Sequence, residues 1–397
     1  MKIKTDITVV GAGPGGTTAA RLLADGGLEV ILVERKNEIG KDIRCAEGID
    51  LPTVDQVVGK IPENLISWPI DRIFIDYADQ RISLNAPGHG VILERYLFDK
   101  YLAQLAAKAG AQIMLECEIN EVNLKDHKWF LSGNYQHQKI SIESKAVIAA
   151  DGVDSLIGKM AGINTSLNPR DVYSCAEIKG DISGREEEGA LLISLDEKLF
   201  TGGYAWSFPK AGGLANIGLG IRGDAGGKCA KDRLEIWLNE KFMGVPRLSY
   251  LVGAVPAKKM EAISTEGMML IGDAARLADP ISGGGIGPAL TSAQLAAEVM
   301  IKLWHKNELD KTYKYDDAWW NGEGKQLEQR LFLRNIYIAN DKKLLKPVFE
   351  WGMKNLDGKH IDEFSADEML LGLIKAVPVL FKMASSIVPT LMKMVFK

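Results

Sequence analysis

TDITVVGAGPGG, residues 5–16, is the stretch of sequence that decides the fold. Its first six residues predict a buried β-strand, and the glycine-rich turn leads into an Ala- and Leu-rich helix over residues 14–25. Residues 28–33 (LEVILV) then predict a second, parallel strand, which completes a βαβ unit. This order of elements is typical of a doubly wound α/β domain that binds a dinucleotide.

The glycines of this turn are expected to have separate tasks. Gly11 allows the tight turn, Gly13 lets the backbone approach a pyrophosphate, and Gly16 lets the helix pack on the strand. Gly15 belongs to the same site, at a helix N-terminus whose free amides and positive dipole end attract phosphate. Glu34 ends the second strand, where its carboxylate can accept both hydroxyls of an adenosine ribose. A glycine turn in this setting indicates a nucleotide site.

Two later segments favour FAD over NAD as the nucleotide. Residues 149–155 (AADGVDS) place Asp151 in an acid–glycine turn after a buried strand. Residues 271–287 (IGDAARLADPISGGGIG) place Asp273 where a ribityl hydroxyl or the pyrophosphate could be held. A second glycine turn then opens a helix whose N-terminus can face the pyrimidine carbonyl of a flavin. We therefore expect three segments of the chain to hold one FAD.

The remaining pattern predicts a second domain inserted into the first. Residues 70–85 alternate polar and apolar side chains like a half-buried hairpin, and residues 94–109 form an amphipathic helix. From about 170 to 256 the pattern is rich in strands and predicts one antiparallel sheet. The domains expected are an FAD-binding domain over 1–165 and 257–304, an antiparallel β substrate domain over 166–256 with the hairpin 70–92, and a C-terminal helical region over 305–397.

Composition argues against several classes of protein. A net charge of −4 argues against a nucleic-acid-binding protein, which usually carries an excess of basic residues. The four cysteines are scattered and form no CxxC, which argues against a zinc site and fits a reduced, cytoplasmic protein. The first strand leaves no room for a signal peptide, and no apolar run is long enough to predict a transmembrane helix.

Four further segments carry a more specific signal. They are RCAEG (44–48), YAWSFP (204–209), ANIGLG (215–220) and GDAARLADPISGGGIGPAL (272–290). Together they resemble the geranylgeranyl reductase family, within the aromatic-hydroxylase-like flavoproteins, and the resemblance spans about residues 5–300. This chain departs from the family at Ala46, where a glycine is common, and at Thr201, where a proline is common.

The resemblance implies where FAD meets the chain. Arg95 matches an arginine that contacts the cofactor, although an exposed helix charge is the ordinary reading of such a residue. Ile119 matches a position whose backbone meets the adenine. The other implied positions are Arg44, Cys45, Ala46 and Gly48 in a loop beside the flavin, Asp273 as an FAD contact, and Gly285 and Ile286 against the isoalloxazine.

The substrate side of the site is expected on the YAWSFP strand. Tyr204, Trp206 and Phe208 alternate, so they share one face and form an apolar wall suited to a polyprenyl chain. An ordinary sheet core would show the same pattern. Cys45, beside the flavin, is a candidate proton source or gate, and the alternative is an inert buried thiol. Cys45, Tyr204 and Trp206 are thus the expected catalytic residues.

The resemblance implies FAD-dependent reduction of carbon–carbon double bonds in geranylgeranyl chains of an archaeal-type lipid precursor. The alternatives are a flavin monooxygenase, a reductase of quinone isoprenoid side chains, and a non-catalytic lipid-binding protein that retains FAD. No second nucleotide fingerprint is evident, so we expect an external electron donor such as ferredoxin, NAD(P)H or a deazaflavin.

Residues 369–397 are apolar, carry lysines but no acids, and are broken by Pro378 and Pro389. This composition fits a segment lying in a membrane interface or a helical lid over the substrate cavity. We therefore expect a peripheral position at the cytoplasmic membrane. The aromatic-rich segment 313–337 could line the same cavity or simply pack between helices.

Overall fold

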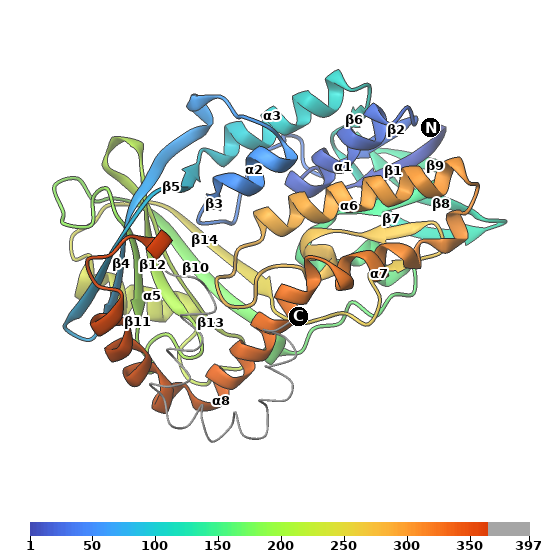
Figure 1. Ribbon diagram of the computed structural model, residues 1–397. Helices are drawn as coiled ribbons and strands as arrows, with labels where there is room; N and C mark the ends of the chain where they lie inside the picture. The colour runs from blue at the N-terminus through green and yellow to red at the C-terminus, as the bar shows by residue number, and fades with distance from the viewer. Residues whose placement is uncertain (364–397) are drawn as a thin grey trace. The chain divides into compact units, whose positions relative to one another are not determined.

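The computed structural model describes residues 1–363, which fall into two compact units (Figure 1). The first unit comprises residues 1–66, 93–173 and 254–332, and the second comprises 67–92, 174–253 and the described residues from 333 onward. Within the described part, no helix is both long enough and apolar enough to cross a bilayer. The segment 369–397 lies outside the described residues, so both roles expected for it stay predictions.

The first unit is built on a sheet with a parallel core. Its order is β15–β16–β9–β1–β2–β6, and the β16–β9, β9–β1, β1–β2 and β2–β6 pairs are all parallel. The bounds are β1 (Lys2–Val10), β2 (Val30–Val33), β6 (Gln112–Met114), β9 (Gln138–Ala149), β15 (Ser264–Thr265) and β16 (Met268–Leu270). β7 (Cys117–Lys125) and β8 (Lys128–Tyr135) extend the sheet from β9. The predicted doubly wound fold is confirmed.

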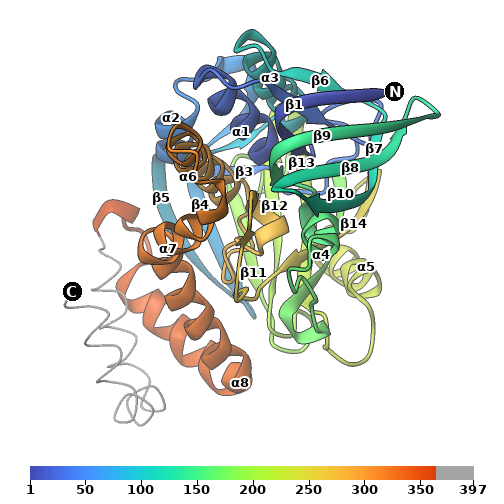
Figure 2. The same cartoon turned by 90° about the vertical axis from the view of Figure 1, so that its right-hand side faces the viewer.

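Helices cover this sheet because its strands are apolar on both faces. Every residue of β2 is buried, as a central parallel strand requires. The helix α1 (Pro14–Asp25) packs against α3 (Arg95–Lys108) and α6 (Ile286–His305), and Figure 2 shows α1 and α6 side by side. The shorter α2 (Leu51–Val57) and α4 (Leu156–Met160) belong to the same unit.

The aromatic-rich segment forms α7 (Tyr313–Asn321) and the start of α8 (Gly324–Asn355). Tyr315 and Trp319 are fully buried in the core of the first unit. The Tyr315 hydroxyl donates a hydrogen bond to the backbone oxygen of Leu270 in β16, at 3.0 Å. For these two residues, helix packing is therefore the correct interpretation of the aromatic pattern.

The second unit holds a sheet in the order β14–β10–β13–β12–β11–β4–β5. The β11–β12 and β12–β13 pairs are antiparallel, as expected. The bounds are β4 (Ile66–Tyr77), β5 (Gln80–Leu93), β10 (Val172–Asp181), β11 (Leu191–Leu195), β12 (Tyr204–Lys210), β13 (Leu214–Arg222) and β14 (Arg247–Pro256).

Two features of this unit differ from the prediction. β11 pairs with β4 in parallel, so the sheet is not wholly antiparallel. A long stretch of chain separates these two strands, so no tight turn forces an antiparallel pairing between them. The helix α5 (Ala230–Lys241) was not anticipated, although Leu234, Trp237 and Leu238 have helical spacing and are buried.

We predict that Tyr315→Phe lowers the free energy of unfolding by about 1 kcal/mol, because it removes a buried hydrogen bond to the central sheet. Urea denaturation followed by tryptophan fluorescence measures this difference. Tyr313→Phe is the matched control, because Tyr313 lies in the same helix and is 56% exposed. Equal effects of the two substitutions would contradict the assigned hydrogen bond.

Candidate functional site

The glycine turn has the geometry that its sequence predicts. Gly11 has a φ of 102°, and a Cβ there would lie 2.3 Å from the backbone oxygen of Ala150. A Cβ on Gly16 would lie 1.8 Å from the backbone oxygen of Gly11, so only glycine lets α1 approach β1 this closely. A Cβ on Gly13 would meet no described atom within 4 Å. The backbone at Gly13 is therefore open to a ligand.

The N-terminus of α1 is available to an anion. Gly13 occupies the N-cap position, and no side chain of the described residues caps the helix there. Pro14 begins the helix without an N–H group of its own. A Cβ on Gly15 would lie 3.1 Å from the backbone oxygen of Ala289, so Gly15 faces α6. The remaining amides of the first turn can bind phosphate oxygens.

Glu34 is fixed beside this turn by two backbone amides. Its Oε2 accepts a hydrogen bond from Ala12 at 2.8 Å, and its Oε1 accepts one from Lys36 at 2.9 Å. A carboxylate has about four acceptor positions, so two remain for ribose hydroxyls. The backbone oxygen of Glu34 accepts from the amide of Cys117 at 2.8 Å, which starts β7 beside this carboxylate. β7 also carries Ile119, which is buried.

Arg95 is buried, so the reading as an exposed helix charge is excluded. Only 7% of Arg95 is exposed, and it donates two hydrogen bonds to Asp99, at 2.7 and 2.9 Å. Burial opposes its positive charge, but Asp99, Cys45 and Glu47 together hold the pKa of Arg95 above its usual value. The start of α3 therefore lies in the electrostatic field of the RCAEG loop.

The RCAEG loop has an unusual backbone. Glu47 is buried and has a φ of 72°, a left-handed conformation that is rare for residues other than glycine. Its amide donates to the Cys45 sulfur at 3.2 Å, and its carbonyl accepts from Leu93 at 2.9 Å. Cys45 and Ala46 are half-buried, whereas Arg44 is exposed. Strained backbone of this kind is often found at functional sites.

Asp273 contacts the start of α6 and interacts electrostatically with Arg95. A Cβ on Gly285 would lie 3.2 Å from the Asp273 Oδ1, so the carboxylate lies against the start of α6, where Ile286 is buried. Burial raises the pKa of Asp273, and Arg276 and Arg95 oppose that rise. The structure thus brings Asp273 within the electrostatic reach of Arg95 and into contact with the α6 N-terminus.

Asp151 lies next to the glycine turn. A Cβ on Gly11 would lie 3.2 Å from the Asp151 Cα. The Asp151 Oδ2 accepts from the amide of Ile157 at 2.9 Å, whereas its buried Oδ1 has no hydrogen-bond donor among residues 1–363. Burial raises the pKa of this carboxyl group. A buried acceptor without a donor, beside an open glycine turn, fits a ligand that carries hydroxyl groups.

The YAWSFP strand carries its three aromatic rings on one face, as predicted. The ring centroids of Tyr204 and Trp206 are 5.8 Å apart, and those of Trp206 and Phe208 are 6.4 Å apart. Ala205 and Ser207, which alternate with them, are fully buried. Ala205 packs in the core that also contains residues of α5. The aromatic wall, here defined as Tyr204, Trp206 and Phe208, is therefore separate from that core.

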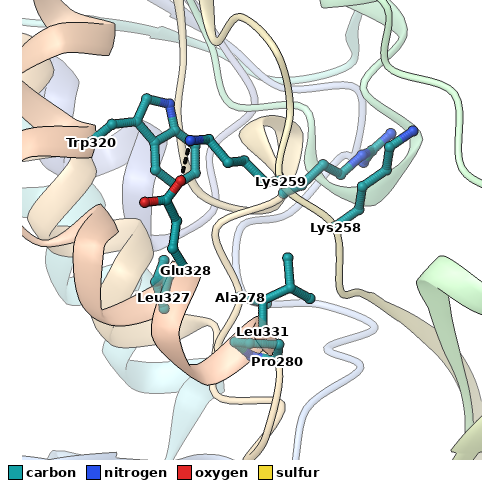
Figure 3. Close-up of a pocket in the computed structure, with 9 residues that line it drawn as sticks. Lys258, Lys259, Ala278, Pro280, Trp320, Leu327, Glu328 and Leu331 are labelled. Carbon is teal, nitrogen blue, oxygen red and sulfur yellow. Dashed lines mark hydrogen bonds and ion pairs between the residues drawn. The ribbon is translucent and has the colours of Figure 1, made fainter. Parts of the chain in front are cut away.

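A small hollow also opens in the first unit (Figure 3). Lys259 pairs there with Glu328, and its ammonium group lies 4.4 Å from the ring centroid of Trp320. Lys258 and Arg276 contribute further positive charge to the lining. Trp320 thus lines this hollow, and a role of its segment in a substrate cavity stays a prediction. The two lysines could not be predicted as part of a site, because their charges follow no recognisable motif in the sequence.

Known protein families match both halves of this arrangement. An FAD binding domain family matches residues 4–181, and a geranylgeranyl reductase catalytic domain family matches residues 171–255. The fold, the open glycine turn and these matches define an FAD-dependent oxidoreductase. Asp151 and Glu34 provide acceptors suited to the hydroxyls of that cofactor.

Two relatives identify the family more closely. A digeranylgeranylglycerophospholipid reductase of Methanothrix thermoacetophila is 34% identical over 389 residues, covering 95% of this chain and 97% of that protein. The enzyme of the same name from Methanosarcina acetivorans is 34% identical over 357 residues, covering 85% and 86%. The chain belongs to the digeranylgeranylglycerophospholipid reductase family.

Solved structures agree with this assignment. A geranylgeranyl bacteriochlorophyll reductase-like protein from Thermoplasma acidophilum has a TM-score of 0.88 at 27% identity, covering 97% of this chain and 100% of that one. A flavin-dependent brominase has a TM-score of 0.73 at 17% identity, covering 98% and 100%. The second likeness shows the shared fold alone.

We predict that Gly13→Ala weakens FAD binding at least about tenfold while the flavin-free protein keeps its melting temperature. Gly13 has φ −73° and ψ −179°, which alanine adopts freely, and the added methyl group would fill space needed by the pyrophosphate. Flavin fluorescence titration and thermal melts of the apoprotein measure the two effects. Gly16→Ala is the contrasting variant, because its methyl group clashes with Gly11 and should lower the melting temperature. Unchanged FAD affinity in Gly13→Ala would contradict the assignment.

We predict that the charge of Asp273 makes the stability of the flavin-free protein depend on pH. Because burial raises the pKa of Asp273, the contribution of this carboxyl group to stability is fully present below its unfolded pKa and is lost as pH rises through its folded pKa. Asp273→Asn should therefore stabilise the flavin-free protein at about pH 8 but not at about pH 4.

Urea denaturation at both pH values tests this prediction, with the exposed Asp55→Asn as the control. The same Asp273→Asn variant should bind FAD more weakly than the parent protein. A variant that is less stable than the parent at the higher pH would show that the charged carboxylate stabilises the fold.

Proposed function

We propose that this flavoprotein reduces carbon–carbon double bonds in the geranylgeranyl chains of a digeranylgeranylglycerol phospholipid precursor. The observation that carries the proposal is the combination of a strained cysteine loop beside Arg95 with an apolar wall of three aromatic rings. The names of the relatives point to the same class of substrate. A polyprenyl lipid is the chemistry that such a wall fits.

The residues of the first unit hold and orient the cofactor in this proposal. Reduced FAD, when bound, supplies the hydride. The glycine turn and Glu34 would hold the pyrophosphate and ribose, and Asp273 and Arg95 would lie near the flavin. We assign the further FAD contacts to Arg44, Cys45, Ala46, Gly48, Ile119, Asp151, Gly285 and Ile286.

The aromatic wall would position the prenyl chain and exclude water. Each reduced double bond takes one hydride on one carbon and one proton on the other. Cys45 is the proposed source or gate of that proton, because its sulfur lies within the field of buried Arg95. Two electrons per double bond must then come from an external donor, for which ferredoxin, NAD(P)H and a deazaflavin are candidates.

A lipid substrate resides in a membrane, so the enzyme must reach the membrane surface to bind it. We propose peripheral association with the cytoplasmic membrane, as the composition of residues 369–397 indicates. Sedimentation with vesicles of anionic lipid, compared between the full chain and a variant lacking those residues, separates this role from that of a lid.

We predict that dithionite-reduced enzyme converts digeranylgeranylglyceryl phosphate into products heavier in steps of two hydrogen atoms, while the flavin absorption returns. Mass spectrometry of the lipid and the visible spectrum of the same sample measure both changes. A lipid of unchanged mass would refute the proposal and favour a quinone substrate. A hydroxylated product formed with NAD(P)H and oxygen would instead support a monooxygenase.

In the same assay, Cys45→Ser should lower the rate at least about tenfold with unchanged FAD content, because a hydroxyl is a far weaker acid than a thiol. Cys229→Ser is the control, because Cys229 is exposed and lies in the second unit.

A further inference from the structure

A buried carboxylate lies beside the aromatic wall, on the same face of the sheet. Glu177 in β10 accepts a hydrogen bond from the indole Nε1 of Trp206 at 3.0 Å. Glu177 is 7% exposed and Trp206 is 8% exposed, so water has little access to this contact. Its neighbours Ala176 and Ile178 are buried in the core on the opposite face of the sheet, so Glu177 shares the face of Trp206.

Two glycines make room for this contact. β13 lies between β12 and β10 in the sheet, so the Trp206 ring must cross β13 to reach Glu177. Gly218 is the register partner of Trp206, and a Cβ there would lie 2.6 Å from the indole Cζ2. A Cβ on Gly220 would lie 3.8 Å from Cζ3 of the same ring. The indole therefore lies flat against a stretch of β13 that has no side chains on this face.

A neutral, apolar residue would serve a simple sheet core better at position 177. An indole nitrogen is only a donor, and the buried carboxylate gives it a charge-assisted acceptor of defined direction. Such a bond adds a directional constraint on the ring, which packing against the two glycines, Tyr204 and Phe208 does not supply. Cys175 lies close to the same ring and Gly220, and burial together with Glu177 raises its pKa to about 12, so its thiol stays neutral.

We propose that Glu177 is a positioning residue: through its hydrogen bond it fixes the ring plane of Trp206 and so determines which double bond of the prenyl chain is presented for reduction. This inference rests on the proposed function, because it requires Trp206 to contact the prenyl chain. In this proposal Glu177 acts on the substrate through the indole and not by contact with the lipid. Loss of the bond should therefore change selectivity and substrate affinity more than the chemical step.

The test compares Glu177→Ala and Glu177→Gln in the full-length, FAD-loaded protein with digeranylgeranylglyceryl phosphate as substrate. Glu177→Ala should raise KM about tenfold, leave kcat within about twofold, and change the proportions of partially reduced products. Glu177→Gln keeps an acceptor oxygen and should restore most of the parent pattern. Trp206→Phe, which keeps a ring but lacks the donor, should resemble Glu177→Ala even if the alanine variant folds poorly.

Ser207→Ala is the matched control, because Ser207 adjoins Trp206 in β12, and its buried hydroxyl has no hydrogen-bond partner among the residues described. It should reproduce the parent kinetics and products. A second readout needs no substrate: the indole N–H resonance of Trp206 in 15N-tryptophan-labelled protein should shift upfield in Glu177→Ala but not in Ser207→Ala.

The outcomes separate the two proposals. An active parent enzyme whose KM and products are unchanged in Glu177→Ala would overturn the positioning role alone. An indole resonance that does not move would show that the hydrogen bond is not formed, which also overturns it. A parent enzyme that leaves the lipid unreduced would overturn the proposed function and, with it, this inference.

Discussion

The close approach of α1 to β1 is the constraint on which the rest of the structure depends. A Cβ on Gly16 would lie 1.8 Å from the oxygen of Gly11, and one on Gly11 would lie 2.3 Å from the oxygen of Ala150. The ends of β1 and β9 and the start of α1 therefore meet with only backbone between them. This contact sets the open N-terminus of α1 at the carboxyl end of β1, with Glu34 and Asp151 beside it, and so defines where a phosphate can bind.

Much of this arrangement could be predicted because its causes are local. The glycine spacing, the acid that follows β2 and the alternation of aromatic residues in β12 each depend on a few neighbouring residues. The parallel β4–β11 pair could not be predicted, because it joins segments that lie far apart in the chain. The burial of Arg95 and the partner of Trp206 likewise depend on Asp99 and Glu177, whose positions only the folded chain defines.

The two units use buried charge in different ways. In the first unit, burial raises the pKa of Asp273 and Asp151. Both carboxylates, when charged, therefore lower the free energy of unfolding of the flavin-free protein. Groups that destabilise the protein in this way are expected where a ligand must be held. In the second unit, the carboxylate of Glu177 accepts a hydrogen bond from the Trp206 ring of the aromatic wall. This buried acid therefore holds a side chain of an apolar surface in place.

This contrast indicates where the specificity of the reaction arises. A glycine turn, a ribose acid and a helix N-terminus recognise parts of a flavin that take no part in choosing the substrate, and a fold alone does not define an activity. A prenyl chain offers no polar group along its length, so a protein can select one double bond only through the shape and rigidity of an apolar wall. Apolar contacts are non-directional, and rings held by packing alone would let the chain slide. A wall that discriminates must therefore be held rigid, and this is the role proposed for the Trp206–Glu177 hydrogen bond, which Gly218 and Gly220 make possible.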